Sequence, residues 1–264
     1  MKEFHDITVV CPTFNSEKFI EQTINSIFLQ SMTVSELIIS DDGSSDQTIK
    51  IIEECFKKYK GNIACKLLKN PHLGPGAARN TAIKAARGDW IAFIDSDDLW
   101  EENKIHEVSS AIMKNPEVNF ICHNEYRLSL NGNKTIIFCG SRYDKTKSIL
   151  EQLFKANMIS TSATVCKKNL LLNYGLFDES LMSIQDYELW LRISPNMSIL
   201  FLDKILGTYV ERRANITLSR PLQRFQNELL VIFKYRKIVP LRLFYYRILR
   251  LIISHSFQIL KRLF

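Results

Sequence analysis

Three aspartates, Asp95, Asp97 and Asp98, lie within four residues in the stretch FIDSDDLW at residues 93–100. They come directly after an apolar run that is typical of a buried strand. Carboxylates at this spacing repel one another unless a cation or hydrogen-bond donors hold them. Mg²⁺ and Mn²⁺ prefer such oxygen ligands and commonly take one or two carboxylates together with phosphate oxygens. One interpretation of the cluster is therefore a divalent-metal site.

A second interpretation of the same aspartates is structural. Asp98 and Glu101 have the spacing of a capping box, so Asp98 could cap a following helix while the other two carboxylates stay solvated. The pattern D-x-D-D alone does not decide between the two interpretations, and the elements around it have to be considered.

Short β-branched runs alternate with longer stretches of helical period over the first half of the chain. This alternation predicts parallel strands joined by right-handed crossovers, and hence a three-layer α/β/α sheet. Strands are expected at 7–12, 35–41, 62–70 and 89–95, and helices at 17–30, 45–59 and 76–88. Beyond about residue 115 the alternation loosens. There we expect strands at 117–123, 134–139, 161–166, 199–202 and 205–212, and helices at 145–156, 184–194 and from about 219.

Polar clusters follow several of these strands directly. They occupy residues 12–15, 41–46 and 95–98. Ligands of open α/β sheets bind at the carboxyl ends of the strands, so these three loops are expected to converge on one site.

Three other classes of enzyme with this type of sheet do not fit. A phosphatase with an aspartyl nucleophile requires Thr or Val where this chain has Leu99. A dinucleotide-binding protein requires G-x-G-x-x-G after the first strand, whereas Gly74 and Gly76 follow the third strand and Arg79 stands at the last glycine position. A nucleotidyltransferase would have a Gly-rich loop with Arg or Lys after the first strand, and PTFNSEKF has neither glycine nor arginine.

Four segments together are far more specific than any one of them. They are VVCPTFN, ISDDGSSDQT, GPGAARNTAI and DWIAFIDSDDLW, in this order within residues 9–100. The combination resembles the family 2 glycosyltransferases, which are inverting enzymes with the nucleotide-sugar-binding GT-A fold. The later segment GLFDESLMSIQDYELWLRI, residues 175–193, is similar to the acceptor-side segment of that family. The resemblance covers about residues 6–212.

The resemblance implies a donor site for a nucleotide-diphosphate sugar in the first half of the chain. Pro12 and Thr13 would lie against the base, and Asp42 would accept the imide N–H of a uracil. The neighbouring Asp41 has an alternative role as a turn residue bonded to its own backbone. Arg79 would reach the base or the diphosphate, since a guanidinium suits phosphate oxygens, although it could also be a helix-face arginine in water.

The aspartate cluster acquires roles through the same resemblance. Asp95 would face the ribose, Asp97 would serve both the nucleotide and the metal, and Asp98 is an additional metal candidate. The cofactor implied is a divalent cation, Mn²⁺ or Mg²⁺, which would offset the charge of the leaving nucleoside diphosphate.

Inversion also requires a base that removes a proton from the acceptor hydroxyl. The family carries it in a Glu-Asp pair before an aromatic residue and a W-L-R run, which places it on Asp186. The alternative is that Asp186 is a carboxylate in the first turn of a helix, favoured by the helix dipole. This chain has Gln185 where the family commonly has Glu, which removes one charge beside the base.

The basic charge of the chain belongs to its C-terminal end. The net charge is +7, but the last 36 residues hold eight Lys or Arg and no acidic residue, so residues 1–228 sum to −1. This distribution gives no indication of nucleic-acid binding. Residues 1–218 are expected to form one catalytic domain, with a donor half at about 1–115 and an acceptor half at about 116–218. Residues 219–264 would be a basic amphipathic tail.

The tail from 241 to 264 is apolar enough to raise the possibility of a membrane span. On a helix Arg247, Arg250, Ser254, Gln258 and Lys261 would share one stripe. Burying two arginines at the bilayer centre costs roughly 2.5–3.5 kcal/mol each, so we expect the helix to lie on an anionic membrane surface. The alternative is a helix packed on the catalytic domain or in a dimer interface.

The remaining features favour an intracellular protein. The six cysteines show no metal-binding spacing and are expected to be reduced thiols. The apolar stretch at the N-terminus is too short for a signal peptide. We therefore expect a cytoplasmic, peripheral membrane enzyme on the inner face of the cell membrane.

The predicted enzyme is an inverting, metal-dependent glycosyltransferase. It would move one sugar per encounter from a UDP-sugar to a glycan or lipid-linked acceptor, because the Q-x-x-R-W element of processive synthases is absent. The alternative is a catalytically silent member of the fold that binds nucleotide or membrane.

Overall fold

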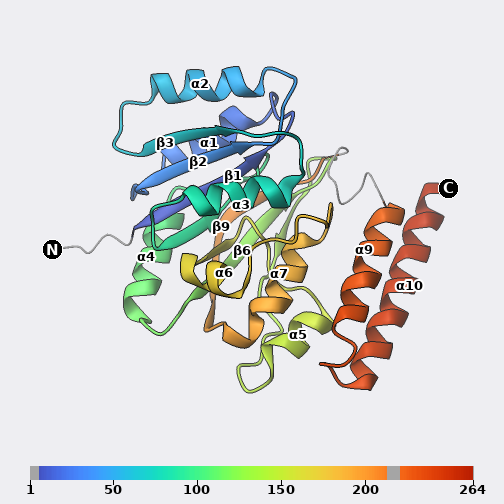
Figure 1. Ribbon diagram of the computed structural model, residues 1–264. Coiled ribbons are helices and arrows are strands. Elements are labelled where there is room, and N and C mark those ends of the chain that lie inside the picture. Colours follow the sequence, from blue (N-terminus) through green and yellow to red (C-terminus); the bar gives the residue numbers. More distant parts are fainter. Residues whose placement is uncertain (1–5, 213–220, 264) are drawn as a thin grey trace.

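The structure of the protein is a computed structural model that describes residues 6–212 and 221–263. Its centre is a mixed sheet of nine strands in the order β3-β2-β1-β4-β8-β6-β9-β5, with β7 paired to β6. Helices cover both faces of this sheet, so the predicted three-layer α/β/α architecture is confirmed (Figure 1).

The first half of the chain is built as the sequence predicts. Its strands are β1 (Ile7–Thr13), β2 (Glu36–Asp41), β3 (Ala64–Lys69) and β4 (Trp90–Phe93), and all of them are parallel. Its helices are α1 (Ile20–Phe28), α2 (Thr48–Lys58) and α3 (Pro75–Ala85). Because β1 lies between β2 and β4, the ends of these strands carry their polar loops to one edge of the sheet.

The second half completes the sheet with mixed strand directions. Its strands are β5 (Leu99–Trp100), β6 (Phe120–Leu128), β7 (Lys134–Ile137), β8 (Thr164–Lys167) and β9 (Ile199–Val210). Its helices are α4 (Lys104–Lys114), α5 (Ile149–Lys155), α6 (Lys168–Tyr174) and α7 (Gln185–Ile193), followed by a 3-10 turn at Ser194–Asn196. Strand β8 runs antiparallel to both β4 and β6, whereas β9 runs parallel to β6.

The structure differs from the local expectations at three places beyond residue 97. The two strands expected at 199–202 and 205–212 form one strand, β9, whose register against β6 shifts around His123–Glu125. Asp98 does not cap a helix, because Leu99 and Trp100 pair with β9 and helix α4 begins only at Lys104. Strand β5 and the helices α4 and α6 were not among the elements expected from the sequence.

Alternating side chains of the strands supply two cores, one on each face of the sheet. In β1, Val9 and Cys11 pack against the face covered by α1, α2 and α4, whereas Val10 packs on the opposite face. The second core is formed with α3, α5, α6 and α7 and centres on Trp190, which contacts the rings of Phe93, Phe120 and Phe177. All six cysteines are free thiols.

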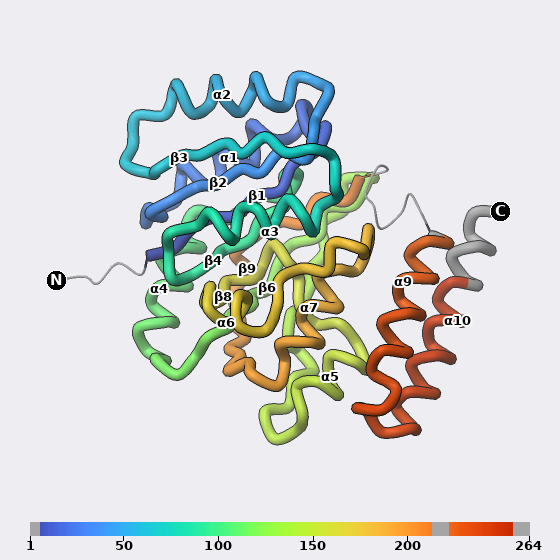
Figure 2. Tube along the Cα trace, in the orientation of Figure 1, coloured from blue at the N-terminus to red at the C-terminus, as the bar shows by residue number. Residues whose placement is uncertain are grey.

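The C-terminal part of the chain is a hairpin of two helices, α9 (Pro221–Lys234) and α10 (Leu241–Leu263), drawn in red at one side of Figures 1 and 2. Val231, Ile232, Tyr235 and Leu251 from its inner face belong to the same core as α5 and α7. The hairpin is thus packed on the catalytic unit. The predicted domain boundary at 218/219 lies outside the described residues.

The structure corrects one member of the helical stripe expected on α10, Arg247, whereas Arg250 and Ser254 are exposed and the side chains of Gln258 and Lys261 lie outside the described ones. Arg247 is buried with 8% exposure and forms an ion pair with Glu228 of α9, so the face that carries it is turned inward. Leucine, isoleucine and tyrosine side chains occupy much of the outward face instead. Within the described ranges, none of the helices combines the length and the hydropathy needed to cross a bilayer.

Candidate active site

A cleft of about 610 Å³ opens at the carboxyl ends of the parallel strands. The predicted site residues that line it are Pro12, Thr13, Asp42, Arg79, Asp95, Asp97 and Asp186. They come from the ends of β1, β2 and β4, from the N-terminal half of α3 and from the first turn of α7, so segments far apart in the sequence meet there. Asp98 does not line the cleft.

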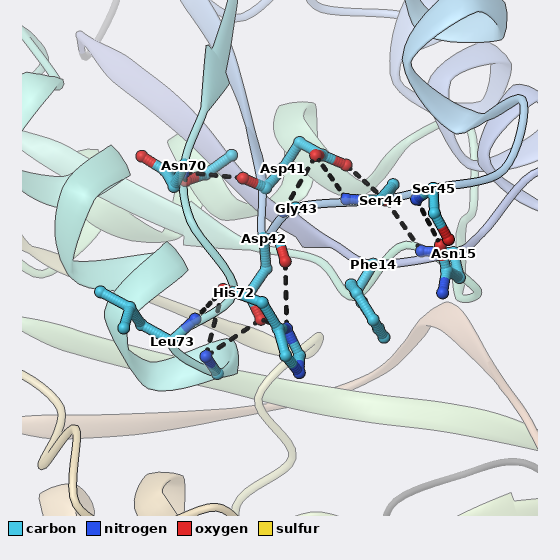
Figure 3. A network of polar contacts seen from close by, with 12 residues as sticks. Phe14, Asn15, Asp41, Asp42, Gly43, Ser44, Ser45, Asn70, His72 and Leu73 are labelled. Atoms are coloured by element: carbon cyan, nitrogen blue, oxygen red, sulfur yellow. Dashed lines mark hydrogen bonds and ion pairs between the residues drawn. The ribbon is translucent and has the colours of Figure 1, made fainter.

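Asp42 is fixed by the loop that leads into α3 (Figure 3). Its Oδ1 accepts hydrogen bonds from the backbone N–H groups of Leu73 at 2.8 Å and Gly74 at 3.1 Å, and its Oδ2 lies 2.8 Å from Nδ1 of His72. Gly74 adopts φ = 97°, a backbone conformation that favours glycine. A carboxylate has about four lone-pair sites, so a further donor in the cleft can still be accepted.

Asp41 has the turn role that the sequence analysis considered for it. Its Oδ2 accepts from the N–H groups of Gly43 and Ser44, and its Oδ1 accepts from the Ser44 hydroxyl (Figure 3). The side chain is 1% exposed and closes the loop that follows β2.

Phe14 and His72 form an aromatic wall of the cleft that the sequence reasoning missed. Their rings stack with centroids 4.2 Å apart and planes 18° apart, next to Asp42 (Figure 3). Phe14 follows Pro12 and Thr13 within a motif already assigned to the base, so its aromatic character was the available signal. No motif pointed to His72.

Arg79 is buried at the wall of the cleft with 5% exposure. Its Nη2 donates to Oδ1 of Asp95, and its Cζ lies 5.3 Å from the centroid of the Phe177 ring. Its Nε and Nη1 have no hydrogen-bond partner among the described residues. Buried guanidinium donors left without a partner are costly, which indicates a site for an anionic ligand.

Asp95 and Asp97 present the negative side of the cleft. Burial and the nearby Asp95 carboxylate raise the pKa of Asp97 to about 6, against the lowering effect of Arg212. Arg212, two residues after β9, places its Nε 3.2 Å from Oδ2 of Asp97. A cation in the cleft would relieve the repulsion between the two carboxylates.

Asp98 lies beneath the loop and is 2% exposed. Its Oδ2 accepts from the Ser162 hydroxyl at 2.6 Å, and its Oδ1 accepts from the N–H of Val210 at 3.0 Å. The same Ser162 Oγ accepts from the N–H of Asp95 at 3.0 Å. Asp98 and Ser162 thereby fix the loop that carries Asp95 and Asp97.

A buried polar layer supports this loop from below, and no motif predicted it. Lys104 is fully buried, with its Nζ 2.7 Å from the carbonyl of Ser162 and 3.8 Å from the centroid of the Trp100 ring. Burial lowers the pKa of Lys104 to about 7 and raises that of the nearby Glu125 to about 7. The layer ties β5, β6 and the segment before β8 to the aspartate loop.

Asp186 lies in the first turn of α7. Its Oδ2 accepts from the Thr161 hydroxyl at 2.9 Å, and both residues line the cleft. The preceding Ile184 has φ = 56°, which is costly for a β-branched residue and is concentrated at functional sites in proteins. Gln185 is buried, with 6% exposure. The structure thus supports a constrained position for the predicted base.

The C-terminal hairpin also reaches the cleft, which the sequence reasoning missed. Glu228 of α9 and Arg247 of α10 are among its lining residues. Both lie in a segment whose composition indicated only a basic surface, so no signal was available.

The described residues contain no group of three or more His, Cys, Asp or Glu side chains arranged to hold a metal ion. Asp97 can supply one carboxylate in the cleft, and Asp95 is a second one beside it. This set fits a divalent cation whose other ligands are diphosphate oxygens, because Mg²⁺ in particular is often bound by one or two carboxylates plus substrate phosphates.

The mixed α/β sheet and its helices have the GT-A type of fold that is found in glycosyltransferases. The family model described as "Glycosyl transferase family 2" matches residues 8–172. The chain belongs to this glycosyltransferase family, and it is an enzyme of the EC 2.4 class.

Two named glycosyltransferases are similar to this chain in sequence. The chain is 33% identical over 195 residues to WfgD of Escherichia coli, covering 73% of this chain and 71% of that protein. WfgD is named as a UDP-Glc:α-D-GlcNAc-diphosphoundecaprenol β-1,3-glucosyltransferase. The chain is also 37% identical over 107 residues to TarS of Staphylococcus aureus, a poly(ribitol-phosphate) β-N-acetylglucosaminyltransferase, covering 40% of this chain but only 18% of TarS.

Solved structures share the fold. The structure of S. aureus TarS with UDP-GlcNAc superposes with a TM-score of 0.69 at 24% identity, covering 87% of this chain and 66% of that one. A mannosyltransferase from Pyrobaculum calidifontis in complex with GDP-Man and Mn²⁺ superposes with a TM-score of 0.70 at 17% identity, covering 96% of this chain and 71% of that one.

Proposed function

We propose that the protein transfers one sugar from a UDP-sugar to a hydroxyl of a lipid-linked glycan, with inversion and with the help of a divalent cation. One observation carries this proposal: the same cleft is lined by a buried arginine with unpartnered donors and by a carboxylate at the start of α7. These are Arg79 and Asp186. The first suits a diphosphate and the second suits a base.

The donor would lie along the ends of β1, β2 and β4. Pro12, Thr13 and the Phe14 ring would contact the base, and Asp42 would accept its imide N–H. Arg79 would donate to the diphosphate. The UDP-sugar donor of WfgD and the UDP-GlcNAc bound to TarS support a uridine nucleotide for this chain.

Asp97 would hold the divalent cation together with the donor diphosphate, and Asp95 would face the ribose. When bound, Mn²⁺ or Mg²⁺ would stabilise the charge that develops on the leaving nucleoside diphosphate. Asp98 was also predicted as a metal ligand, but its carboxylate oxygens bind Ser162 and Val210. Its contacts favour a role in positioning Asp97. The Mn²⁺ named for the Pyrobaculum structure supports use of a cation.

Asp186 would accept the proton of the acceptor hydroxyl as this oxygen attacks the anomeric carbon. The Thr161 hydroxyl donates to one of its oxygens and orients the carboxylate. The attack would come from the face opposite the leaving diphosphate, so the product would have the inverted anomeric configuration.

A lipid-linked acceptor would be met at an anionic membrane surface. The outward face of the hairpin carries large apolar side chains that are 43–67% exposed: Leu230, Phe233, Ile238, Leu241, Tyr245, Leu249, Ile252 and Ile253. The exposed Arg236, Lys237 and Arg242 lie around the turn between its helices. Apolar burial plus about 1 kcal/mol per basic residue favours an anionic leaflet. WfgD, named for an undecaprenol-linked acceptor, supports this proposal.

The test of the transfer reaction is a panel of nucleotide sugars incubated with and without Mn²⁺. We expect metal-dependent release of UDP from one UDP-sugar, faster with a lipid-linked glycan than without it. Binding of UDP without any turnover across the panel would instead identify a catalytically silent member of the fold.

Membrane binding is tested by flotation with vesicles of phosphatidylglycerol and of phosphatidylcholine. We expect binding to the anionic vesicles, and at least a tenfold loss of it in Leu249→Glu/Ile253→Glu. The matched control is Leu29→Glu, because Leu29 is 70% exposed directly after α1, outside the hairpin. Equal binding by all three proteins would contradict the proposal.

A further inference from the structure

An ion pair between the two helices of the C-terminal hairpin forms part of the cleft wall. Nη2 of Arg247 donates to Oε1 of Glu228, and only 9% and 12% of the two side chains are exposed. Both residues line the cleft. Burying two charges costs solvation free energy that their attraction does not always repay, so such pairs are weak devices for stability alone.

The arginine of this pair is not fully satisfied by the protein. Its Nε has no hydrogen-bond partner among the described residues. A pair that served only to join α9 to α10 would gain stability from a partner at this atom. The guanidinium also hydrogen-bonds the Tyr187 side chain of α7, so Nε is the donor of Arg247 that remains for a ligand in the cleft.

The pair packs against the first turn of α7, the turn that carries the predicted catalytic base Asp186. Cζ of Arg247 lies 5.7 Å from the ring centroid of Tyr187, the residue after Asp186. Helix α9 is joined to α7 and to the loop before it by Lys234 with Glu188 and by Asn227, whose Nδ2 donates to Ser183 Oγ at 3.0 Å. Helix α10 packs on α5 as well as on α9, on the side of the molecule away from β2 and β3 (Figure 1). The pair thus belongs to the end of the cleft opposite the loops that are predicted to bind the nucleobase.

We propose that Glu228 and Arg247 form a subsite for the acceptor sugar and bind two neighbouring hydroxyl groups of it. This inference rests on the proposed transferase function and names a part of its acceptor site. A hydroxyl both donates and accepts, so adjacent hydroxyls match a carboxylate beside a guanidinium. The pair has no net charge, and an anionic group on Arg247 would face the carboxylate of Glu228. Neutral hydroxyls therefore suit the subsite better than a phosphate does.

The variants separate this role from a structural one. Arg247→Met leaves Glu228 buried without its partner and could fail to fold, so the decisive variant is Glu228→Gln/Arg247→Met, which removes both charges. The matched control is Arg87→Met, because Arg87 pairs with the buried Glu36 at the start of β2, outside the cleft. Thermal unfolding by circular dichroism establishes that each variant is folded.

The kinetic probe is GlcNAc joined through a diphosphate to a phenoxyundecyl chain, used with the UDP-sugar that the panel selects. We expect the double variant to raise the acceptor KM by 10- to 100-fold, while the donor KM for hydrolysis without acceptor changes less than twofold. Arg87→Met should change neither constant. An unchanged acceptor KM in a folded double variant, or an equal change of donor and acceptor KM, would overturn the proposal.

A binding measurement keeps the subsite testable without turnover. Saturation-transfer NMR with UDP, Mn²⁺ and methyl β-GlcNAc, which has no phosphate, should show contact to wild type and to Arg87→Met but not to the double variant. If wild type binds this sugar but transfers nothing, the proposed function fails while the subsite stands. If the double variant no longer binds the diphosphate-linked probe but still binds the methyl glycoside as wild type does, the pair binds phosphate. That result would overturn the hydroxyl subsite.

Discussion

The two ends of the cleft are built in different ways. At the donor end, carboxylates follow strands and are held by backbone N–H groups of neighbouring loops, as in the case of Asp42 with Leu73 and Gly74. At the opposite end, the polar groups come from helices and meet through side chains, as Asp186 meets Thr161 and Glu228 meets Arg247. The donor end depends on the parallel sheet, whereas the other end depends on how α7, α9 and α10 pack.

Because of this difference, the two ends of the cleft tolerate different substitutions. A loop whose carboxylate is bound by backbone groups tolerates few alternatives, because the geometry of several strands is fixed together. Side chains on packed helices can be exchanged without moving the sheet. We expect such a molecule to keep one donor chemistry while its acceptor varies, and the following variants test this separation.

The largest effect is expected from Asp186→Asn. Loss of a base typically costs 10²–10⁴-fold in rate, so we expect kcat for transfer to fall about 10³-fold. The affinity for UDP, measured by calorimetry, should change less than twofold because the donor end is untouched. Comparable losses of UDP affinity and of kcat would show that Asp186 belongs to the donor end.

Asp97→Asn is expected to change stability with pH. Burial and Asp95 raise the pKa of Asp97 to about 6 from an ordinary value of 3.8, so the folded protein retains this proton to higher pH than the unfolded chain. The resulting stabilisation is fully present below about pH 3.8 and is lost as the pH rises through about 6.

Asp97→Asn has no carboxyl group to titrate at this position, so it does not lose this stabilisation. Without metal, its free energy of unfolding should therefore rise relative to that of wild type between pH 4 and pH 7. The shift corresponds to at most about 3 kcal/mol in the free energy of unfolding. Denaturation by urea at several pH values measures it. A difference between the two proteins that stays constant with pH would contradict the raised pKa.

Arg79→Met removes the guanidinium from the donor end. Hydrogen bonds to charged groups contribute about 1.5–3 kcal/mol, so we expect the donor KM to rise 10- to 100-fold. The acceptor KM at saturating donor should stay within twofold of wild type. A rise in acceptor KM alone would assign Arg79 to the other end of the cleft.

Ser162→Ala is expected to have the smallest effect. Its hydroxyl bridges the N–H of Asp95 and the carboxylate of Asp98, and leaving these groups unsatisfied should lower the free energy of unfolding by about 1–3 kcal/mol. Thermal unfolding measures this loss. Thr81→Ala, which removes only a hydroxyl that donates to the Ala77 carbonyl within α3, is a control that should cost less.

The same contrast explains what the sequence could predict. The parallel half of the sheet and the residues that reach the cleft from its strand ends follow from local patterns, in which a β-branched run precedes a polar loop. Asp42, Asp95 and Asp97 lie in the polar loops that this pattern marked, whereas Arg79 was assigned through the resemblance to the family, and the structure brings all four to one cleft. Asp186 was found through its resemblance to a family segment.

The remaining features depend on contacts between distant segments. Asp98 looked like a cap because the residues that follow it, Leu99 and Trp100, were not recognised as a strand that pairs with β9. Arg247 looked like a surface residue because a helical stripe does not show which side another helix covers, and here its partner Glu228 turns it inward. Tertiary packing determines whether such a short strand forms and whether such a charged side chain turns inward.

The central claim is that this cleft transfers a sugar with inversion, and the configuration of the product tests it most directly. Proton NMR can follow the reaction of wild-type protein with an α-linked UDP-sugar, Mn²⁺ and a lipid-linked glycan acceptor. The account predicts that UDP accumulates together with a β-linked product. An α-linked product, or no consumption of any nucleotide sugar in the presence of acceptor, would contradict it.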